Sequence, residues 1–135
     1  MLLGKKSRKG YFNMYYKMYQ TRYAKKNKFG AVKTHGFDSK KEFNRYQELK
    51  LLEKAGEVSD IKAQERFDLY GKNGNKICSY KADFTYFEKD GTRVIEDVKS
   101  KITCTSVFRI KWKLLEDNLK EQIHNGEIKL LINFC

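Results

Sequence analysis

The apolar residues that follow position 38 first recur at helical spacing. Four of them fall three positions apart: Phe43, Tyr46, Leu49 and Leu52. This spacing gathers them on one face of a helix. Ser39 followed three residues later by Glu42 is a capping box, which marks a helix start, and Gly56 is a typical residue at a helix end. The pattern therefore predicts a helix that begins at Ser39 and ends at Gly56.

Three stretches rich in β-branched and aromatic residues come next, with polar turns between them. The expected strands cover residues 64–70, about 77–87 and 93–99, and the expected turns cover residues 57–60, 71–75 and 88–92. Short turns with glycine between such stretches favour hairpins. This part of the chain therefore predicts a sheet built largely from hairpins.

The last part of the chain returns to helical spacing and then ends in an apolar strand. The helical stripe of residues 106–125 consists of Phe108, Trp112, Leu115, Leu119 and Ile123. Gly126 stops this helix, and residues 127–133 form the expected strand. The predicted order of elements is α-β-β-β-α-β, an α/β (α+β) fold.

The first residues carry a different pattern, a tyrosine at every fourth position. The four tyrosines are Tyr11, Tyr15, Tyr19 and Tyr23. They predict a helix over residues 11–27 with one tyrosine face. This face either packs on the rest of the protein or on a second copy, or it stacks on nucleic-acid bases while lysines and arginines follow the phosphates. A membrane-surface helix would favour Leu, Phe and Trp instead.

Charge divides the chain at the same place. The 135 residues contain 29 Lys or Arg and 17 Asp or Glu, which gives a net charge of +12. Residues 1–37 carry ten of the basic side chains and no acidic one, so residues 38–135 are almost neutral. We expect a basic, tyrosine-rich N-terminal helix on residues 1–37 and one folded core on residues 38–135. The charge of the first part favours an anionic partner such as nucleic acid.

Other classes of protein are less compatible with the sequence. No apolar run approaches the roughly 18 residues of a membrane span, and the first ten residues do not have the order of a secretory signal. We therefore expect a cytoplasmic protein without membrane contact. The three cysteines are widely spaced and form no CxxC pair, which predicts neither a disulfide framework nor a zinc site.

The chemistry appears at the second hairpin. Its loop, Lys89-Asp90-Gly91, has the form of a type I turn followed by a left-handed glycine. With that loop, Asp83 lies directly opposite Asp97, and Lys99 follows two residues along the same face. The same register pairs Lys81 with Lys99 and Thr85 with Ile95. The other face is expected to be core: Ala82, Phe84, Tyr86, Val94 and Val98.

Two facing carboxylates repel each other unless a cation lies between them. Because the available ligands are oxygen atoms, Mg²⁺ or Mn²⁺ is the expected metal. The alternative is a solvated charge cluster on an exposed sheet face, since Asp-x-Lys and Glu-x-Lys occur elsewhere in this charged sequence. A two-residue loop at Asp90-Gly91 would move Asp83 to the opposite face and remove the site.

The combined motifs resemble those of the PD-(D/E)xK nuclease superfamily, and more closely an uncharacterised phage family assigned to it. The matching residues are Ser39-Lys-Lys-Glu42, Gln64, Tyr80-Lys-Ala-Asp83-Phe, Glu96-Asp-Val-Lys99-Ser and Lys111-Trp-Lys-Leu. The resemblance covers about residues 36–132 and implies a restriction-endonuclease-like core with a mixed sheet flanked by helices. It also implies that Asp83 and Asp97 hold the metal and that Lys99 positions the attacking water or the scissile phosphate. Ala82 stands where the superfamily name has proline.

The resemblance leaves three residues open. Glu42 matches the acid of the first helix that often completes the metal site, but it also has the capping-box role. Gln64 matches a strand position of the family without a defined role. Glu96 would replace Asp97 as the ligand if a bulge interrupted its strand, whereas regular alternation places it on the core side and favours Asp97.

The implied activity is that of a Mg²⁺- or Mn²⁺-dependent DNA endonuclease, encoded by a phage and then active in the host cytoplasm. Expected nucleic-acid contacts in the N-terminal part are Lys5, Lys6, Arg8, Lys9, Lys17, Arg22, Lys25 and Lys26. Those near the site are Lys101, Arg109, Lys111 and Lys113, which are otherwise the solvated face of a helix.

The small size and the absence of an added recognition domain favour branched or junction DNA as the substrate. Paired cleavage of two strands needs two active sites, which predicts a homodimer. Two alternatives stay open: a nucleic-acid-binding protein without catalysis that uses the basic N-terminal helix, and an interaction protein whose tyrosine helix mediates self-association.

Overall fold

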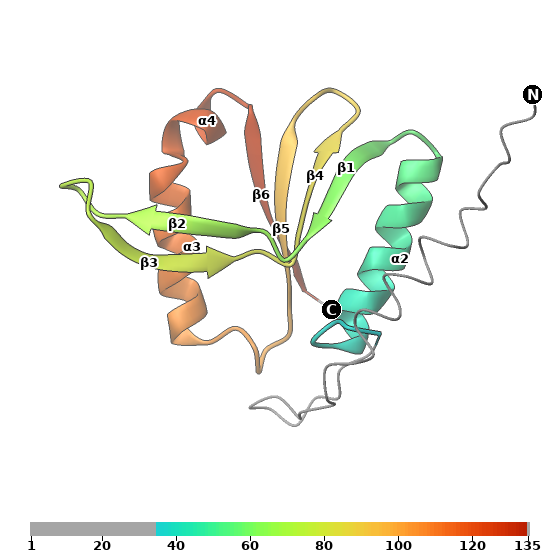
Figure 1. Cartoon of the computed structure of the whole chain (residues 1–135), viewed down its shortest axis with the longest axis horizontal. Helices are drawn as coiled ribbons and strands as arrows, with labels where there is room; N and C mark the ends of the chain where they lie inside the picture. The colour runs from blue at the N-terminus through green and yellow to red at the C-terminus, as the bar shows by residue number, and fades with distance from the viewer. Residues whose placement is uncertain (1–34, 135) are drawn as a thin grey trace, which may run out of the picture. The chain divides into compact units, whose positions relative to one another are not determined.

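The computed structural model describes residues 35–134 (Figure 1). The predicted tyrosine helix and the eight basic residues expected to bind nucleic acid near the N-terminus lie outside the described residues. The chain divides into two compact units, residues 1–43 and residues 44–135, and each is described by itself.

The described part of the first unit contains the predicted capping box. The Ser39 hydroxyl accepts a hydrogen bond from the Glu42 N–H and donates one to the Glu42 carboxylate, both at 3.2 Å. The other Glu42 oxygen accepts the N–H of Asp38 at 3.3 Å. Helix α2 (Lys40–Lys54) begins directly after Ser39, as predicted, because these contacts satisfy N–H groups that a helix start leaves free.

The second unit is an α+β fold built on a mixed four-stranded sheet. The strands are β1 (Val58–Ala63), β4 (Phe84–Glu88), β5 (Arg93–Lys99) and β6 (Ile128–Phe134), in the order β1-β4-β5-β6. The pairs β1–β4 and β4–β5 are antiparallel, and β5–β6 is parallel. The predicted α+β class, with a mixed sheet and flanking helices, is confirmed, and the finer prediction of a restriction-endonuclease-like core stays a prediction.

Strand β1 corrects the prediction of a turn at residues 57–60. Five of its six residues are not fully buried, and its register with β4 shifts between Ser59 and Lys62. Asp60 has a positive φ of 52° within this irregularity. A polar edge strand with a bulge lacks the alternation that identifies a strand in a sequence, and for this reason the pattern predicts a turn instead.

A second correction concerns the strand expected at residues 77–87. It is two strands in two different sheets: β3 (Lys76–Lys81) pairs with β2 (Arg66–Tyr70), and β4 belongs to the main sheet. The pairing nevertheless continues through the break, because the Gln64 N–H bonds to the Asp83 carbonyl and the Ala82 N–H to the Glu65 carbonyl, both at 2.9 Å. The β2–β3 hairpin is therefore the outer half of one long, sharply bent hairpin.

The bend itself lies at Gln64, which has a φ of 60°, a left-handed conformation that non-glycine residues adopt infrequently. Ala82 consequently belongs to a different core from Phe84, which corrects the prediction that the two share a face. Asp83 lies at the bend, one residue before β4 begins.

The predicted C-terminal helix is also divided. Helix α3 (Ser106–Asn118) is followed by the short helix α4 (Lys120–His124), with Leu119 between them. The Thr105 side chain caps α3 by accepting the Phe108 N–H at 3.2 Å. Gly126 follows α4 with a φ of 76°, in agreement with its predicted role as a helix stop. None of the described helices is long and apolar enough to cross a membrane.

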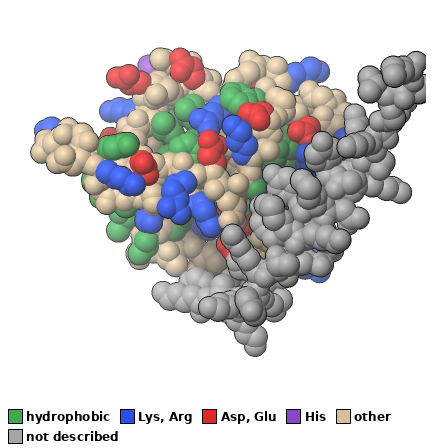
Figure 2. All heavy atoms as spheres, viewed as in Figure 1, with side chains coloured by type: hydrophobic (Ala, Val, Ile, Leu, Met, Phe, Trp, Pro, Cys, Tyr) green, Lys and Arg blue, Asp and Glu red, His purple; other side chains and the backbone are tan. Residues whose placement is uncertain are grey.

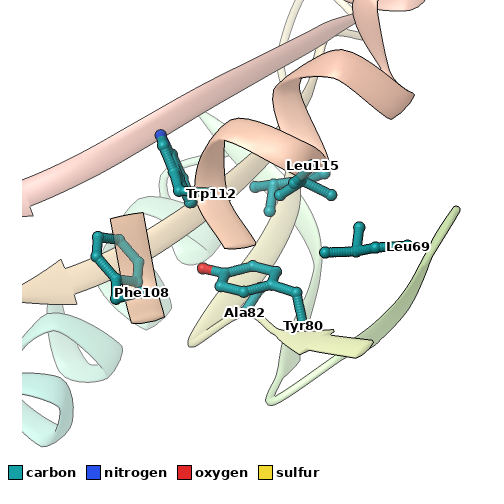
Figure 3. Packing of buried hydrophobic residues seen from close by; sticks show 7 residues of the cluster. Leu69, Tyr80, Ala82, Phe108, Trp112 and Leu115 are labelled. Atoms are coloured by element: carbon teal, nitrogen blue, oxygen red, sulfur yellow. The ribbon is translucent and has the colours of Figure 1, made fainter. Parts of the chain in front are cut away.

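Side chains cover both faces of the sheet. On one face, α3 and the β2–β3 hairpin enclose a buried cluster: Leu69, Tyr80, Ala82, Ile95, Phe108, Trp112 and Leu115 (Figure 3). On the other face, the part of α2 that belongs to the second unit places Tyr46 against Phe84, with ring centroids 6.2 Å apart. The face of β5 that carries Asp97, which the alternative interpretation of the sequence leaves exposed to solvent, is covered by α3 and the β2–β3 hairpin.

Candidate metal-binding site

The β4–β5 hairpin has the predicted loop and register. The Glu88 N–H bonds to the Thr92 carbonyl and the Gly91 N–H to the Glu88 carbonyl, both at 2.9 Å. Gly91 has a φ of 90°, which the left-handed position of this three-residue loop requires. The registered pairs, among them Thr85 opposite Ile95, follow the predicted register. The alternative two-residue loop is therefore wrong.

This register brings Asp83 to β5. One Asp83 oxygen accepts the backbone N–H of Val98 at 2.7 Å, so the carboxylate contacts the residue between Asp97 and Lys99. Lys81, in contrast, does not lie opposite Lys99. It pairs with Arg66 in the β2–β3 hairpin, because the bend carries it out of the main sheet.

Asp97 is buried and incompletely hydrogen-bonded. The residue is only 1% exposed. Oδ2 accepts a hydrogen bond from the Tyr80 hydroxyl. Oδ1 forms an ion pair with the Lys99 ammonium group but has no hydrogen-bond partner in the described part of the chain. The alternative of a solvated charge cluster is therefore wrong for Asp97.

Lys99 connects the carboxylate to the aromatic core. Its side chain is 16% exposed, and Nζ lies 4.5 Å from the centroid of the Phe108 ring. The ring face attracts the ammonium group, as in other cation–π contacts. Lys99 thus lies between a buried anion and an aromatic ring, with a small part of it open to solvent.

Tyr80 is a site residue whose role the sequence does not predict, although it belongs to the quoted motif. It comes from β3, and its ring lies in the buried cluster 5.8 Å from the Trp112 ring (Figure 3). Burial, and after it the negative charge of Asp97, raises the pKa of the Tyr80 phenol far above its usual value. The phenol is therefore a neutral hydrogen-bond donor to Asp97 at any ordinary pH.

Glu96 lies on the opposite face of β5, as alternation predicts. It is fully buried and accepts hydrogen bonds from Arg45 Nε at 2.7 Å and Arg45 Nη2 at 3.1 Å. The Tyr86 hydroxyl at 2.8 Å and the Asn133 amide at 3.2 Å complete its contacts. The pairing of β5 with both neighbours is regular, so no bulge turns Glu96 toward Asp83.

Arg45 is a residue that the sequence does not single out. It lies on α2, 51 positions before its partner Glu96, and no local pattern connects the two. The hydrogen bond to Glu96 is the largest influence on Arg45, and it raises the pKa of the guanidinium above its already high value. Burial, followed by the bond to Glu96, raises the pKa of Tyr86. The Glu96 carboxylate therefore has an ion pair with Arg45 and hydrogen bonds from two neutral side chains, Tyr86 and Asn133.

The remaining predicted site residues have different surroundings. Glu42 is buried and has the capping-box contacts in the first unit, and its role as a metal ligand stays a prediction. Gln64 lies at the bend and accepts a hydrogen bond from Lys81 Nζ at 3.0 Å.

The four basic residues expected to hold phosphates near the site differ in exposure and in their contacts. Lys101 and Arg109 are exposed. Lys113 is also exposed and pairs with Glu116 at 3.0 Å. Lys111 donates from Nζ to the Ser79 carbonyl at 2.9 Å and so joins α3 to β3. Their contact with nucleic acid stays a prediction.

The donor chemistry of the site fits a hard divalent cation. Residues 35–134 contain no group of three or more His, Cys, Asp and Glu side chains arranged around a metal position. Mg²⁺, however, is commonly held by one or two carboxylates together with waters and substrate phosphates. Asp83 and Asp97 supply two such carboxylates, and a metal on Asp97 Oδ1 would take the place of the Lys99 ammonium group, its ion-pair partner.

Comparison with known proteins identifies the family. No match was found among the curated proteins or among the solved structures. The family model described as "Protein of unknown function (DUF1064)" matches residues 20–131, which is most of the chain. The chain therefore belongs to the DUF1064 family.

Proposed function

We propose that the protein is a Mg²⁺- or Mn²⁺-dependent DNA endonuclease. The observation that carries the proposal is Asp97, a buried carboxylate that is paired with Lys99 and lies next to a second acid, Asp83. Two acids and a lysine that meet at one place, with one of the acids buried, are the kind of titratable cluster that marks a candidate functional site. The same residues carry the resemblance to the PD-(D/E)xK nucleases.

Each residue has a proposed role in the hydrolysis of a phosphodiester. Asp83 and Asp97 would hold the metal, which would lower the pKa of a bound water and stabilise the charge that develops on the phosphate. Tyr80 holds Asp97 in one orientation through the hydrogen bond to Oδ2. Lys99 gives a positive contact to the phosphate oxygens, where negative charge increases in the transition state.

The substrate and the assembly belong to the same proposal. The folded core of residues 38–135 is small and therefore suited to reading DNA shape more than a long sequence, which favours branched or junction DNA. Cutting both strands in step requires a second site, which a homodimer supplies. We place the enzyme in the cytoplasm, that of the host if the chain comes from a phage.

The test is a cleavage assay on branched, single-stranded and duplex DNA in Mg²⁺, in Mn²⁺ and in EDTA. Asp83→Asn and Asp97→Asn each remove one proposed ligand and should lower the rate by at least ~100-fold, as expected for a metal ligand. Asp117→Asn is the matched control, because Asp117 is an exposed aspartate at the end of α3. Equal cleavage by Asp97→Asn and Asp117→Asn, or no cleavage by the wild type, would contradict the proposal.

A second candidate is a nucleic-acid-binding protein without catalysis. It is favoured by the ten basic residues and no acid in residues 1–37, and by the lack of a third carboxylate at the site among residues 35–134. In this case binding falls steeply with salt, and no metal-dependent product forms. The same assay, with binding measured beside cleavage, separates the two candidates.

A further inference from the structure

We infer that the outer face of the β2–β3 hairpin binds the phosphate backbone of duplex DNA. This inference rests on the proposed function and deepens it, because it names the surface that holds the substrate. None of the residues on this face was among the expected nucleic-acid contacts. Three features of the hairpin support it: its charges, the partners of those charges and the connection to Asp97.

The two faces of the hairpin differ in composition. The inner face packs on α3 and consists of the registered pairs Phe67–Tyr80 and Leu69–Cys78. Because side chains alternate along a strand, the intervening residues lie on the outer face. These are Arg66 opposite Lys81, and Asp68 opposite Ser79. The register shifts between Leu69 and Tyr70, and beyond the shift Tyr70 pairs with Lys76, whose ammonium group reaches the outer face through its ion pair with Asp68. The outer face is therefore rich in basic side chains, and Figure 2 shows Lys and Arg gathered over this part of the molecule.

Arg66 and Lys81 are a like-charge pair. They are direct cross-strand partners and both are exposed. Two positive charges directly opposite each other destabilise a sheet. Lys81 turns its ammonium group to the neutral Gln64 oxygen, and no ion pair of Arg66 or Lys81 is found in residues 35–134. A bound anion would relieve this repulsion.

The acids of the hairpin are already engaged. Asp68 pairs with Lys76 at 2.9 Å. Glu65 accepts hydrogen bonds from Thr85 and from Arg93, the latter at 2.7 Å. Residues 1–37 contain no acidic side chain, so they supply no charge that neutralises the pair. Positive charge on this face is therefore available to an external partner.

The far end of the hairpin adds groups suited to a nucleic acid. Tyr70 is 45% exposed and Ile77 is 61% exposed, near the turn that carries the exposed Lys72. Aromatic and apolar side chains beside basic ones contact sugars and bases, while the basic ones contact phosphates. This composition fits DNA better than it fits an apolar protein partner.

The hairpin is also joined directly to the proposed catalytic residues. Tyr80, which donates to Asp97, is the neighbour of Lys81, and Asp83 follows two residues later. In a strand, Tyr80 and Lys81 lie on opposite faces, so one face of β3 fixes the carboxylate and the other is open to DNA. DNA held by Lys81 would thus be anchored beside the strand that supports the site.

The test compares two double variants with the same change in charge. Arg66→Gln with Lys81→Gln removes the pair, and Lys54→Gln with Lys120→Gln removes two exposed lysines elsewhere in the second unit. Binding of a fluorescent duplex DNA to the full chain is measured in EDTA over a series of salt concentrations. The first variant should lose roughly tenfold in affinity, and its salt slope should fall by about 2, whereas the control should change little.

A conservative variant, a matched RNA duplex and a separate cleavage measurement distinguish the possible results. The conservative variant Arg66→Lys with Lys81→Arg keeps both charges and should bind nearly as the wild type does. Equal losses in the two glutamine variants would overturn the inference, and so would tighter binding of a matched RNA duplex than of DNA. Cleavage in Mg²⁺ is measured separately on the wild type. A selective loss of DNA affinity without cleavage by the wild type would support the hairpin surface and reject the nuclease.

Discussion

Glu96 and Asp97 are adjacent on β5 and both are buried, yet their carboxylates lie on opposite faces of the sheet with opposite hydrogen-bonding states. Glu96 accepts hydrogen bonds from three side chains, and Arg45 contributes two of those bonds. Asp97 accepts one hydrogen bond, from the Tyr80 hydroxyl, and its other oxygen has only the ion pair with Lys99 in the described part of the chain. We interpret Glu96 as a structural residue and propose Asp97 as the metal ligand.

The first prediction separates these two carboxylates by stability. Glu96→Gln should destabilise the fold by about 3 kcal/mol, because it breaks a buried ion pair. Arg45 would then keep only its second ion pair, with Glu48, which lies at the surface. Asp97→Asn should cost less, since Lys99 has access to solvent. Urea unfolding measures both effects, and Mn²⁺ titration shows whether metal binding is lost only in Asp97→Asn. Loss of metal binding in Glu96→Gln with unchanged stability would assign the ligand to Glu96 instead.

A second prediction concerns competition between Lys99 and the metal. Because the Lys99 ammonium group contacts the Asp97 oxygen that a metal would need, Lys99→Met should bind Mn²⁺ several-fold more tightly than the wild type. The same variant should lose cleavage. Lys120→Met, at an exposed lysine of α4 outside every predicted contact, is the control and should change neither property. Isothermal titration calorimetry gives the affinities, and weaker binding by Lys99→Met would contradict the competition.

A third prediction concerns Tyr80. Tyr80→Phe removes the donor to Asp97 Oδ2 and keeps the ring in the aromatic cluster. Loss of a residue that orients a metal ligand commonly lowers metal affinity by about 10–100-fold. The unpaired carboxylate oxygen should also destabilise the fold by about 1–3 kcal/mol. Tyr70→Phe, on the outer hairpin face, is the matched control, and equal metal affinities for the two variants would count against this role.

The fourth prediction follows from the direction of the Tyr80 pKa. Burial and then Asp97 raise the pKa of Tyr80 in the folded protein, whereas the unfolded chain ionises near the ordinary value of about 10. The resulting stability is present below pH ~10 and decreases as the pH rises above it. Thermal unfolding between neutral and strongly alkaline pH should show a steeper loss for the wild type than for Tyr80→Phe. Parallel curves would show that Tyr80 is not the titrating group.

The sequence is most informative where the chemistry is local. The three-residue loop ending in Gly91 determines the register of β4 and β5, so the loop residues alone are enough to place Thr85 opposite Ile95. The capping box of Ser39 and Glu42 is equally local. Both depend on contacts between residues at most four positions apart.

Features that depend on distant contacts have no such signal. The bend at Gln64 uses a left-handed non-glycine residue, and no sequence pattern marks it. Without the bend, the β2–β3 hairpin could not be expected to cover β5 or to bring Tyr80 to Asp97. The Arg45–Glu96 pair spans 51 positions between α2 and β5 and likewise leaves no local pattern.

Trp112 is the only tryptophan of the chain, and its ring lies edge-on to Tyr80, 5.8 Å away. Tyr80 in turn donates its hydroxyl hydrogen to Asp97. Indole emission responds to changes in its immediate surroundings, and here the surroundings include the ring that holds the proposed metal ligand. Trp112 is therefore linked to the Asp97 carboxylate through Tyr80 alone. Changes at the proposed metal site can be measured by the tryptophan fluorescence of the unlabelled protein.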